Sequence, residues 1–253
     1  MISARLSEIV KFCDILLKVN SFKDYNEAVN GLQFQNNGKV TKVGAAVDVD
    51  LQTVQSAVEN QCNLIVVHHG LMWNATYPYV EKRYEMVKLL VNHNVAVYSS
   101  HLPLDANPEI GNNIILCKKL GLKNIEPFLN LKGQSIGFKS RCSIKREKLK
   151  STLAQIIGQN PILIPHGPDV CKRIGIVSGG AGEDLNIAVQ EGVDTYITGE
   201  GPYWTQYFAE ISNVNVFYCG HYQTETFGVK ALAETISKKF KLPWIFIDKK
   251  VFI

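Results

Sequence analysis

Short runs of purely apolar residues, each followed at once by glycine or polar residues, constrain the fold of this chain more than any other feature. Residues 64–67 form one such run and end at His68-His69-Gly70, and residues 95–98 form another. Strands that are apolar on both faces and alternate with helices are typical of a largely parallel sheet covered on both sides. The sequence therefore predicts an α/β fold.

The alternation of strands and helices occurs in both halves of the chain. Amphipathic or helix-like spacing predicts helices near residues 6–17, 81–92, 110–120, 146–157 and 225–239. A further helix is expected to begin near Leu51, with Asp50 as its cap. Strands are predicted near residues 40–49, 64–67, 95–98, 161–164, 174–177, 195–197, 214–218 and 244–247. We therefore expect two related α/β lobes with largely parallel or mixed sheets and a boundary near residues 122–134. The first lobe takes residues 1–125, to which 225–253 return, and the second takes 126–224.

The composition indicates a folded protein with no need for a nucleic-acid partner. Of its 253 residues 46% are hydrophobic, which excludes disorder and supplies a core that needs no disulfides. Lys and Arg number 27 against 23 Asp and Glu, so the net charge is only +4, and the two signs are interleaved. Such a pattern is typical of a solvated surface, and nucleic-acid binding remains the weakest functional hypothesis.

The cysteines and the apolar runs indicate the compartment. None of the six cysteines forms a CxxC pair, and most lie in apolar stretches, which favours buried free thiols in a reducing environment. The first residues lack the layout of a signal peptide, and no apolar run approaches the roughly 20 residues that span a bilayer. We expect a cytoplasmic protein that is not associated with a membrane.

Metal-ligating side chains follow three of the predicted strands. His68 and His69 follow one strand, Asp105 the next, and His221 with Glu225 a third. Functional residues of α/β sheets gather at the carboxyl ends of strands. Imidazoles mixed with carboxylates suit Zn, Mn, Fe, Co or Ni better than Ca or Mg. These five residues are therefore the candidate ligands.

The same residues also allow one centre with two ions. Because Gly70 ends the strand, we expect His68 and His69 to turn from a loop toward one cavity. Asp105 and Glu225 can each bridge two ions through their two carboxylate oxygens. Five side chains shared by two ions leave positions open for water, as in catalytic sites.

Each of these residues also has a purely structural interpretation. A His-His pair after a strand can be part of a hydrogen-bonded loop, and Asp105 can be a helix cap. Glu225 can be a solvated residue in the first turn of a helix, where its charge favours the helix dipole. Only their joint placement at strand ends favours a metal site, and on spacing alone the two interpretations are evenly matched.

Three further motifs carry weaker functional hypotheses. The glycine run 178–182 follows a strand and can cradle an anion, although a tight turn without a ligand is the more common arrangement. The aromatic residues 203–208 can stack on a base, but they suit a core or an oligomer contact better. His101 is a candidate partner of a ligand or a proton shuttle, and the hypothesis that it is only hydrogen-bonded at a strand end keeps it outside the catalytic set.

Several motifs together resemble a known family. Asn30-Gly31-Leu32-Gln33, Val67-His68-His69-Gly70, Ser100-His101-Leu102-Pro103-Leu104-Asp105, Ser178-Gly179-Gly180-Ala181-Gly182, Thr198-Gly199-Glu200 and Gly220-His221-Tyr222-Gln223-Thr224-Glu225 occur in this order. They are similar to motifs of the Nif-three-like family, often labelled GTP cyclohydrolase 1 type 2 homologues. The chain corresponds to the short form of that family, which lacks an inserted middle domain.

The resemblance implies a fold, an assembly and a ligand set. It implies two α/β lobes with a dinuclear metal centre in the cleft between them and a toroidal homohexamer. It also implies that the ligands of two divalent ions per subunit are His68, His69, Asp105, His221 and Glu225. The segment His101-Leu102-Pro103-Leu104-Asp105 departs from the commoner His-Thr-x-Leu-Asp, which keeps the ligand and alters its surroundings.

Two functions remain open from the sequence. The first is a metal-dependent hydrolase of a small molecule, with a nucleotide as one candidate, in which the ions activate water. The second is a protein without enzymatic activity that stores or delivers metal or acts as an interaction scaffold. A residue placed as general acid or base would discriminate between them, and the sequence identifies none.

Overall fold

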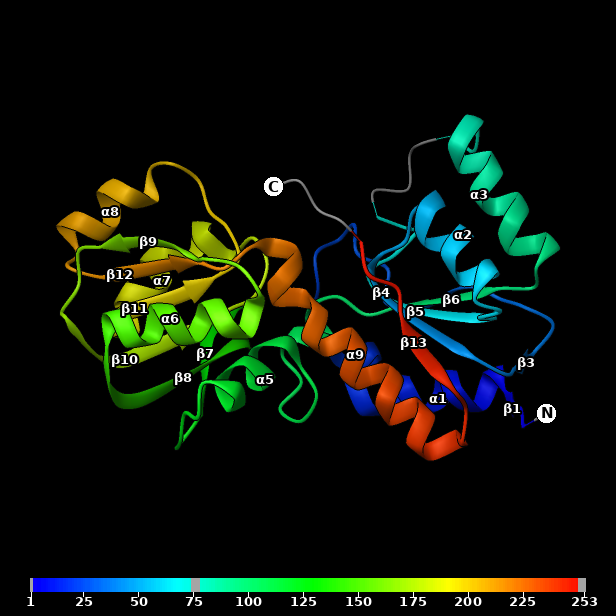
Figure 1. Ribbon diagram of the computed structural model, residues 1–253, viewed down its shortest axis with the longest axis horizontal. Coiled ribbons are helices and arrows are strands. Elements are labelled where there is room, and N and C mark those ends of the chain that lie inside the picture. Colours follow the sequence, from blue (N-terminus) through cyan, green and yellow to red (C-terminus); the bar gives the residue numbers. More distant parts are fainter. Residues whose placement is uncertain (1, 74–77, 250–253) are drawn as a thin grey trace. The chain divides into compact units, whose positions relative to one another are not determined.

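The computed structural model describes residues 2–73 and 78–249, and this part of the chain divides into two compact units (Figure 1). Unit 1 holds the described residues up to Leu104 and those from Gly228 onward, and unit 2 holds Asp105 to Phe227. The chain therefore passes between the units after Leu104 and again after Phe227. The lobe boundaries that the sequence predicts, 125/126 and 224/225, stay a prediction.

Unit 1 contains a five-stranded sheet in the order β13-β4-β5-β6-β2. Its strands are β2 (Gly31–Phe34), β4 (Val43–Asp48), β5 (Leu64–His69), β6 (Ala96–Ser99) and β13 (Trp244–Phe246). Strands β13, β4, β5 and β6 are parallel, and β2 pairs antiparallel with β6 at the edge. A separate two-stranded ribbon joins β1 (Ala4–Arg5) to β3 (Lys39–Val40).

Helices cover both faces of this sheet, which explains why its strands are apolar throughout. The helices of unit 1 are α1 (Leu6–Leu17), the short η1 (Val19–Ser21), α2 (Leu51–Glu59), α3 (Glu81–Asn92), α4 (Leu102–Asp105) and the later part of α9 (His221–Phe240). Helix α4 ends on Asp105, the first residue of unit 2. Helices α2 and α3 lie on one face, where Val54 and Leu90 pack against Ile65 and Val67. Helices α1 and α9 lie on the other, where Phe12 and Phe240 form an edge-to-face pair (Figure 1).

Unit 2 contains a six-stranded mixed sheet in the order β7-β8-β10-β11-β12-β9. Its strands are β7 (Glu126–Leu131), β8 (Gln134–Lys145), β9 (Ile162–Pro165), β10 (Val170–Ile176), β11 (Thr195–Thr198) and β12 (Asn215–Tyr218). Strands β10, β11 and β12 are parallel, whereas β7, β8 and β9 are joined by antiparallel pairs. The predicted α/β fold with parallel and mixed sheets is thus confirmed.

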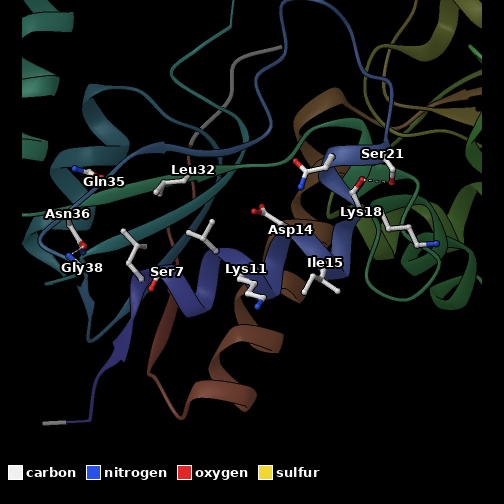
Figure 2. Close-up of a pocket in the computed structure, with 13 residues that line it drawn as sticks. Ser7, Lys11, Asp14, Ile15, Lys18, Ser21, Leu32, Gln35, Asn36 and Gly38 are labelled. Atoms are coloured by element: carbon white, nitrogen blue, oxygen red, sulfur yellow. Dashed lines mark hydrogen bonds between the residues drawn. The ribbon is translucent and has the colours of Figure 1, made fainter.

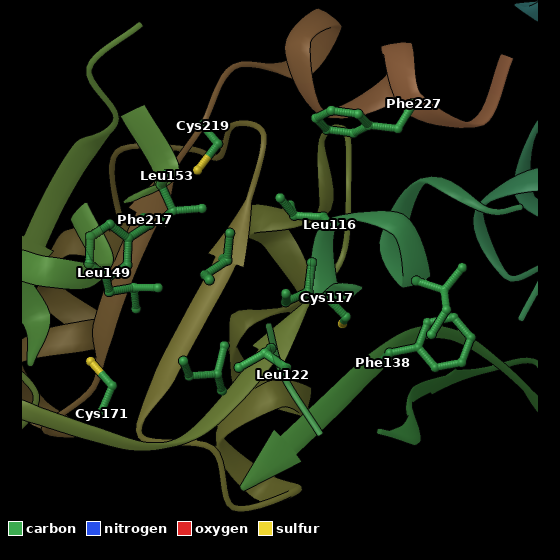
Figure 3. Packing of buried hydrophobic residues seen from close by; sticks show 14 residues of the cluster. Leu116, Cys117, Leu122, Phe138, Leu149, Leu153, Cys171, Phe217, Cys219 and Phe227 are labelled. Carbon is green, nitrogen blue, oxygen red and sulfur yellow. The ribbon is translucent and has the colours of Figure 1, made fainter. Parts of the chain in front are cut away.

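The core of unit 2 forms where its helices pack against its sheet. The helices of this unit are α5 (Asn112–Lys119), α6 (Arg146–Ile157), η2 (Ala181–Asp184), α7 (Leu185–Gln190), α8 (Thr205–Ile211) and the first turns of α9. Leu116 of α5 and Leu149 and Leu153 of α6 pack with Phe217 of β12 in one apolar cluster (Figure 3). Helix α5, whose sequence lies in the predicted first lobe, therefore contributes its apolar face to unit 2.

Three elements differ from the sequence prediction. The stretch expected to connect the lobes contains strand β7 and the turn that joins it to β8. The turn residues Lys132 and Gly133 both have positive φ, as hairpin turns require. Strand β5 continues through His69, and α9 begins at His221 rather than near residue 225. Within the described residues, no helix combines the length and apolar character needed to cross a bilayer.

Candidate metal centre

Strand β5 carries two of the predicted ligands. We expect a loop at His68 and His69, and this expectation is wrong, because Asp48 of β4 pairs with His69 and Val49 N donates to the carbonyl oxygen of His69 at 3.1 Å. The ladder with β4 thereby extends the strand by two residues. The two rings nevertheless lie close together, with centroids 4.8 Å apart.

His101, which the sequence leaves outside the ligand set, joins this pair. It follows strand β6 and directly precedes α4, and its ring centroid lies 4.9 Å from that of His68 and 5.6 Å from that of His69. One ring nitrogen of each of the three histidines lies within 4.8 Å of those of the other two, so the group can hold a metal ion. The structure therefore adds a third imidazole to unit 1.

Hydrogen bonds fix the tautomer of all three imidazoles. Nδ1 of His68 lies 3.0 Å from the carbonyl oxygen of Ser100, and Nδ1 of His69 lies 2.8 Å from Oδ1 of Asp48. Nδ1 of His101 lies 2.9 Å from Oδ1 of Asp24. Because carbonyl and carboxylate oxygens only accept, each Nδ1 donates, and in the neutral imidazole each Nε2 then carries the lone pair. Metal-ligating histidines are oriented in this way, and the donor set fits a borderline divalent cation.

Asp105 is the first ligand candidate of unit 2 and ends helix α4. Its side chain is only 5% exposed. Oδ1 accepts a hydrogen bond from Nδ2 of Asn112 at 2.7 Å and another from Oγ of Ser178 at 2.8 Å. These donors hold the carboxylate in one orientation, which a buried carboxylate needs if it is to act as a metal ligand.

His221 and Glu225 lie one turn apart on α9. Nε2 of His221 is 3.1 Å from Oε1 of Glu225, and Nδ1 is 2.8 Å from Oε1 of Glu200, which follows β11. Burial disfavours the charged imidazole, but the hydrogen bonds and the charges of Glu225 and Glu200 outweigh it and raise the pKa of His221 to about 9. Two carboxylates therefore supply negative charge to this cluster, as a cation site requires.

The glycine turn after β10 packs against the donors of unit 2. Ser178 contacts Asp105, and the next residue, Gly179, has φ of +69°. A Cβ at Gly179 would collide with Oε1 of Glu225. The backbone N–H of Gly179 donates to Oγ1 of Thr224 at 3.0 Å. The turn thus positions two carboxylates, a role that the sequence pattern of glycines does not reveal.

Within each unit, the predicted ligands of that unit lie close to one another. His68 and His69 lie together in unit 1, and His221 and Glu225 lie together in unit 2, where Asp105 and Glu225 both adjoin the turn of Ser178 and Gly179. Sequence reasoning missed Asp24, Asp48 and Glu200 as partners of the histidines. Asp24 and Asp48 lie outside the recognisable motifs, whereas Glu200 ends the motif Thr198-Gly199-Glu200, which could have indicated it.

The thiol beside His221 is not part of this chemistry. Burial raises the pKa of Cys219 to about 12, so this thiol stays protonated near neutral pH. All six cysteines, which lie within the described residues, are free thiols, and Cys142 alone among them is partly exposed. The expected free and largely buried thiols are thus confirmed.

Two cavities of unit 1 differ in their relation to the histidines. A cavity of about 730 Å³ lies between α1 and the end of β2, with Lys11, Asp14 and Leu32 among its lining residues (Figure 2), and it contains no candidate ligand. A cavity of about 480 Å³ opens at the ends of β4 and β5 and is lined by Gly70, which follows His69, and by Lys82. Only the second adjoins the histidine cluster along the chain.

Comparisons with known proteins extend over nearly the whole chain. The model of the family described as Duf34/NIF3 (NGG1p interacting factor 3) matches residues 4–251. Two proteins named GTP cyclohydrolase 1 type 2 homolog are similar to this chain. That of Archaeoglobus fulgidus is 35% identical over 96% of this chain and 97% of its own length. That of Pyrococcus abyssi is 36% identical over 95% of this chain and 96% of its own length. The crystal structure of TTHA1606 from Thermus thermophilus has a TM-score of 0.91 at 32% identity and covers 99% of this chain and 100% of that one.

Proposed function

The chain belongs to the Duf34/NIF3 family, and from this premise we propose that it binds two divalent metal ions and hydrolyses a small molecule. The proposed ligands are the five residues His68, His69, Asp105, His221 and Glu225. Zn, Fe, Mn, Co and Ni all suit a mixture of imidazoles and carboxylates.

The orientation of the imidazole rings of His68 and His69 is the main observation that supports the proposal. His68 and His69 are not merely near each other, since the Nδ1 atom of each is bound to an acceptor and Nε2 carries the lone pair. A hydrogen-bonded loop, the alternative interpretation of this pair, would not require that both rings be held in the tautomer that ligates a metal. In unit 2 the carboxylate of Glu200 meets Nδ1 of His221, and Nε2 of His221 lies 3.1 Å from the carboxylate of Glu225, which is 2% exposed.

We further propose that the donors of both units serve the same two ions. The chain passes between the units directly before Asp105 and again two residues after Glu225. Each of these connections lies within a few residues of a proposed ligand. A carboxylate at such a position can bridge two ions through its two oxygens.

The residues of the chain have separate roles in the proposed hydrolysis. A bound pair of divalent ions supplies Lewis acidity that activates water and polarises a carbonyl or phosphoryl group. Asp48 orients His69, and Ser178 together with Asn112 orients Asp105. The cavity of about 480 Å³ beside Gly70 is large enough for a small molecule such as a nucleotide.

We also propose that the chain assembles as a toroidal homohexamer and acts in the cytoplasm. Support for an assembly comes from the aromatic residues around α8, since Tyr203 is 89% exposed and Tyr207 is 67% exposed. Exposed aromatic clusters of this kind are typical of protein interfaces. The free thiols support a reducing compartment.

Metal analysis followed by a substrate screen tests the proposal. Elemental analysis of reconstituted protein should approach two equivalents of metal, and Asp105→Ala should lower the binding of both ions. A screen of phosphoesters, nucleotides and cyclic amides with and without chelator should then find a hydrolysis that needs metal. Two bound ions without any turnover would favour metal storage, metal delivery or a scaffold, and an Asp105→Ala variant with two tight ions would remove Asp105 from the centre.

A further inference from the structure

We propose that the larger cavity of unit 1 binds a small zwitterion with one ammonium group, two anionic groups and an apolar body. A dipeptide with an acidic first residue and an apolar second residue has this chemistry. The cavity has a volume of about 730 Å³, within the range of small-molecule sites, and none of the five proposed metal ligands, all of them described residues, lines it. The inference is therefore independent of the proposed hydrolysis.

One strip of helix α1 supplies charges of alternating sign to the cavity. Lys11, Asp14 and Lys18, the last of which caps the helix, follow one another at spacings of three and four residues and all line the cavity (Figure 2). Because a helix makes one turn in 3.6 residues, the three side chains emerge on one side of α1, and the two lysines are about 10 Å apart along its axis. A ligand whose positive charge lies between two negative charges matches this order.

Asp14 is the residue that carries the inference, because its carboxylate has only a neutral partner. Its Oδ1 accepts a hydrogen bond from the hydroxyl of Tyr98 at 2.9 Å. Burial raises the pKa of Tyr98 well above its ordinary value, so this hydroxyl keeps the proton that it donates. In the part of the chain that the structure describes, no Lys, Arg or His forms an ion pair with Asp14. A half-buried carboxylate loses part of its hydration, and the ammonium group of a ligand compensates for that loss.

The two lysines also lack carboxylate partners. Lys11 and Lys18 are exposed, and no acidic residue in the described ranges 2–73 and 78–249 forms an ion pair with either. Asp14 stands at the two helix spacings at which such pairs form, but it turns toward Tyr98 instead. The charged residues in the described lining are these two lysines and Asp14, so the lining has one net positive charge. Two anionic groups and one ammonium group complement it.

An apolar wall of the cavity adjoins the carboxylate of Asp14. Val10 of α1 and Leu32 of β2 line the cavity, and Leu32 is 37% exposed. Leu32 pairs with Tyr98 across the sheet, so it lies beside the residue that binds Asp14. Because β2 is the edge strand of its sheet, no further strand covers Leu32 within the described residues. An apolar group of the ligand that packs here removes both surfaces from water, which favours binding.

The experiment is a calorimetric titration of the full chain with glutamyl-leucine, in which the ammonium group lies between two carboxylates. It is made with and without a chelator, because a chelator separates binding in the cavity from coordination of the peptide to a metal ion. We expect one site per chain with the same affinity in both conditions. N-acetyl-glutamyl-leucine, which lacks the ammonium group, and glutamyl-serine, which lacks the apolar side chain, should each bind about 10-fold more weakly.

Variants of the charged residues identify the groups that bind. Asp14→Asn keeps an oxygen that accepts from Tyr98 but removes the charge, so the affinity for glutamyl-leucine should fall by about 10-fold. The affinity for the acetylated peptide should not fall, because that peptide has no ammonium group to lose. Lys11→Gln and Lys18→Gln should each weaken the binding of glutamyl-leucine by about 3-fold. Lys88→Gln, at an exposed lysine of α3 outside the lining, is the matched control.

Three results would overturn the inference. The first is an equal affinity of the wild type and Asp14→Asn for glutamyl-leucine. The second is binding that the chelator abolishes, because the peptide then occupies a metal ion. The third is no measurable binding, and light scattering of a variant with both lysines replaced by glutamate then shows whether the cavity is a contact between copies of this chain. Circular dichroism verifies folding, and should Asp14→Asn unfold, the lysine variants and the acetylated peptide decide by the same titration.

Discussion

His69 and Asp48 are paired neighbours on the parallel strands β5 and β4, and Nδ1 of His69 lies 2.8 Å from Oδ1 of Asp48. The sheet register alone brings these side chains together at the carboxyl ends of the two strands. The pair therefore couples the packing of unit 1 to the orientation of a proposed ligand. A carboxylate in this position orients the ring so that Nε2 is the nitrogen left to bind metal.

Replacing the Asp48 carboxylate should weaken metal binding without unfolding the protein. Asp48→Asn keeps an oxygen that accepts from His69 but removes the charge, so we expect Zn²⁺ affinity to fall by about 10-fold or more. Competition with a chromophoric chelator measures the affinity. Glu59→Gln, at an exposed carboxylate that ends α2, is the control and should retain full affinity. Equal affinities of the Asp48→Asn variant and the wild type would contradict the role of Asp48.

Asp50 should stabilise unit 1 in a manner that depends on pH. It caps α2 by accepting from Thr53 N at 2.8 Å and pairs with Lys249 at 2.6 Å. Burial works against its ionisation, but hydrogen bonds from Lys249 and Thr53 outweigh it and hold the pKa of Asp50 below its ordinary value. Asp50→Ala should therefore lower the free energy of unfolding by about 1 kcal/mol near neutral pH.

The sign of the pH effect follows from the lowered pKa of Asp50. Because the folded pKa lies below the unfolded one, the stabilisation is complete above the unfolded value of about 4 and is lost as the pH falls through the folded value. Urea unfolding of wild type and Asp50→Ala should differ at about pH 7, and the difference should shrink at a lower pH, below the unfolded value of about 4. A difference that stays constant down to the lower pH would show that Asp50 acts through its shape rather than its charge.

The strands that build the sheet of unit 1 could be predicted because their signal is local. Residues such as Ile65 and Val66 are apolar on successive positions, which a parallel strand between two helical layers requires. The cap at Asp50 is equally local, since the residue accepts from an N–H only three positions later. Likewise, the donors at strand ends follow from a rule of α/β sheets that needs no structure.

The partners of the histidines could not be predicted, because they come from distant parts of the chain. Asp24 and His101 are 77 residues apart, and Asp24 lies in a segment without helical or strand periodicity. The continuation of β5 through His69 depends on pairing with β4, which no local pattern of β5 encodes. The hairpin of β7 and β8 was obscured in the same way, since its turn at Lys132 and Gly133 is indistinguishable in sequence from a linker.

The proposed assembly can be tested by its mass. Light scattering of the wild type should give six times the 28.3 kDa of one chain. If the aromatic cluster around α8 forms a contact, replacing Tyr203 and Tyr207 by serine should shift the distribution to smaller species, because buried aromatic residues dominate interface energies. Tyr84→Ser, at an aromatic residue of α3 that is 55% exposed, is the control. A wild-type monomer at micromolar concentration would contradict the hexamer.

Gly179 should be required for metal binding beyond its conformational role. Gly179→Ala places a Cβ against Oε1 of Glu225 at a positive φ, whereas Gly192→Ala meets nothing within 4 Å at a similar φ of +81°. Both variants should lose about 1–2 kcal/mol of unfolding free energy from the left-handed backbone. Only Gly179→Ala should also lose Zn²⁺ affinity, because Glu225 is displaced. Calorimetry of metal binding and urea unfolding separate the two effects, and equal metal affinities would exclude a positioning role for this turn.

The negative charge of Glu225 should be required for activity but not for folding. Glu225→Gln keeps the size of the side chain but removes the negative charge of the carboxylate, whose Oε1 lies 3.1 Å from Nε2 of His221. Residue 225, a proposed ligand, should therefore bind the ions more weakly. Most of the metal-dependent hydrolysis of any accepted substrate should disappear, with thermal unfolding close to that of the wild type. His93→Gln, which alters an exposed histidine at the end of α3, should retain wild-type activity. Equal loss in both variants would indicate a general effect on stability. Full activity of Glu225→Gln, or of protein stripped of metal, would reject the hydrolase and favour a scaffold.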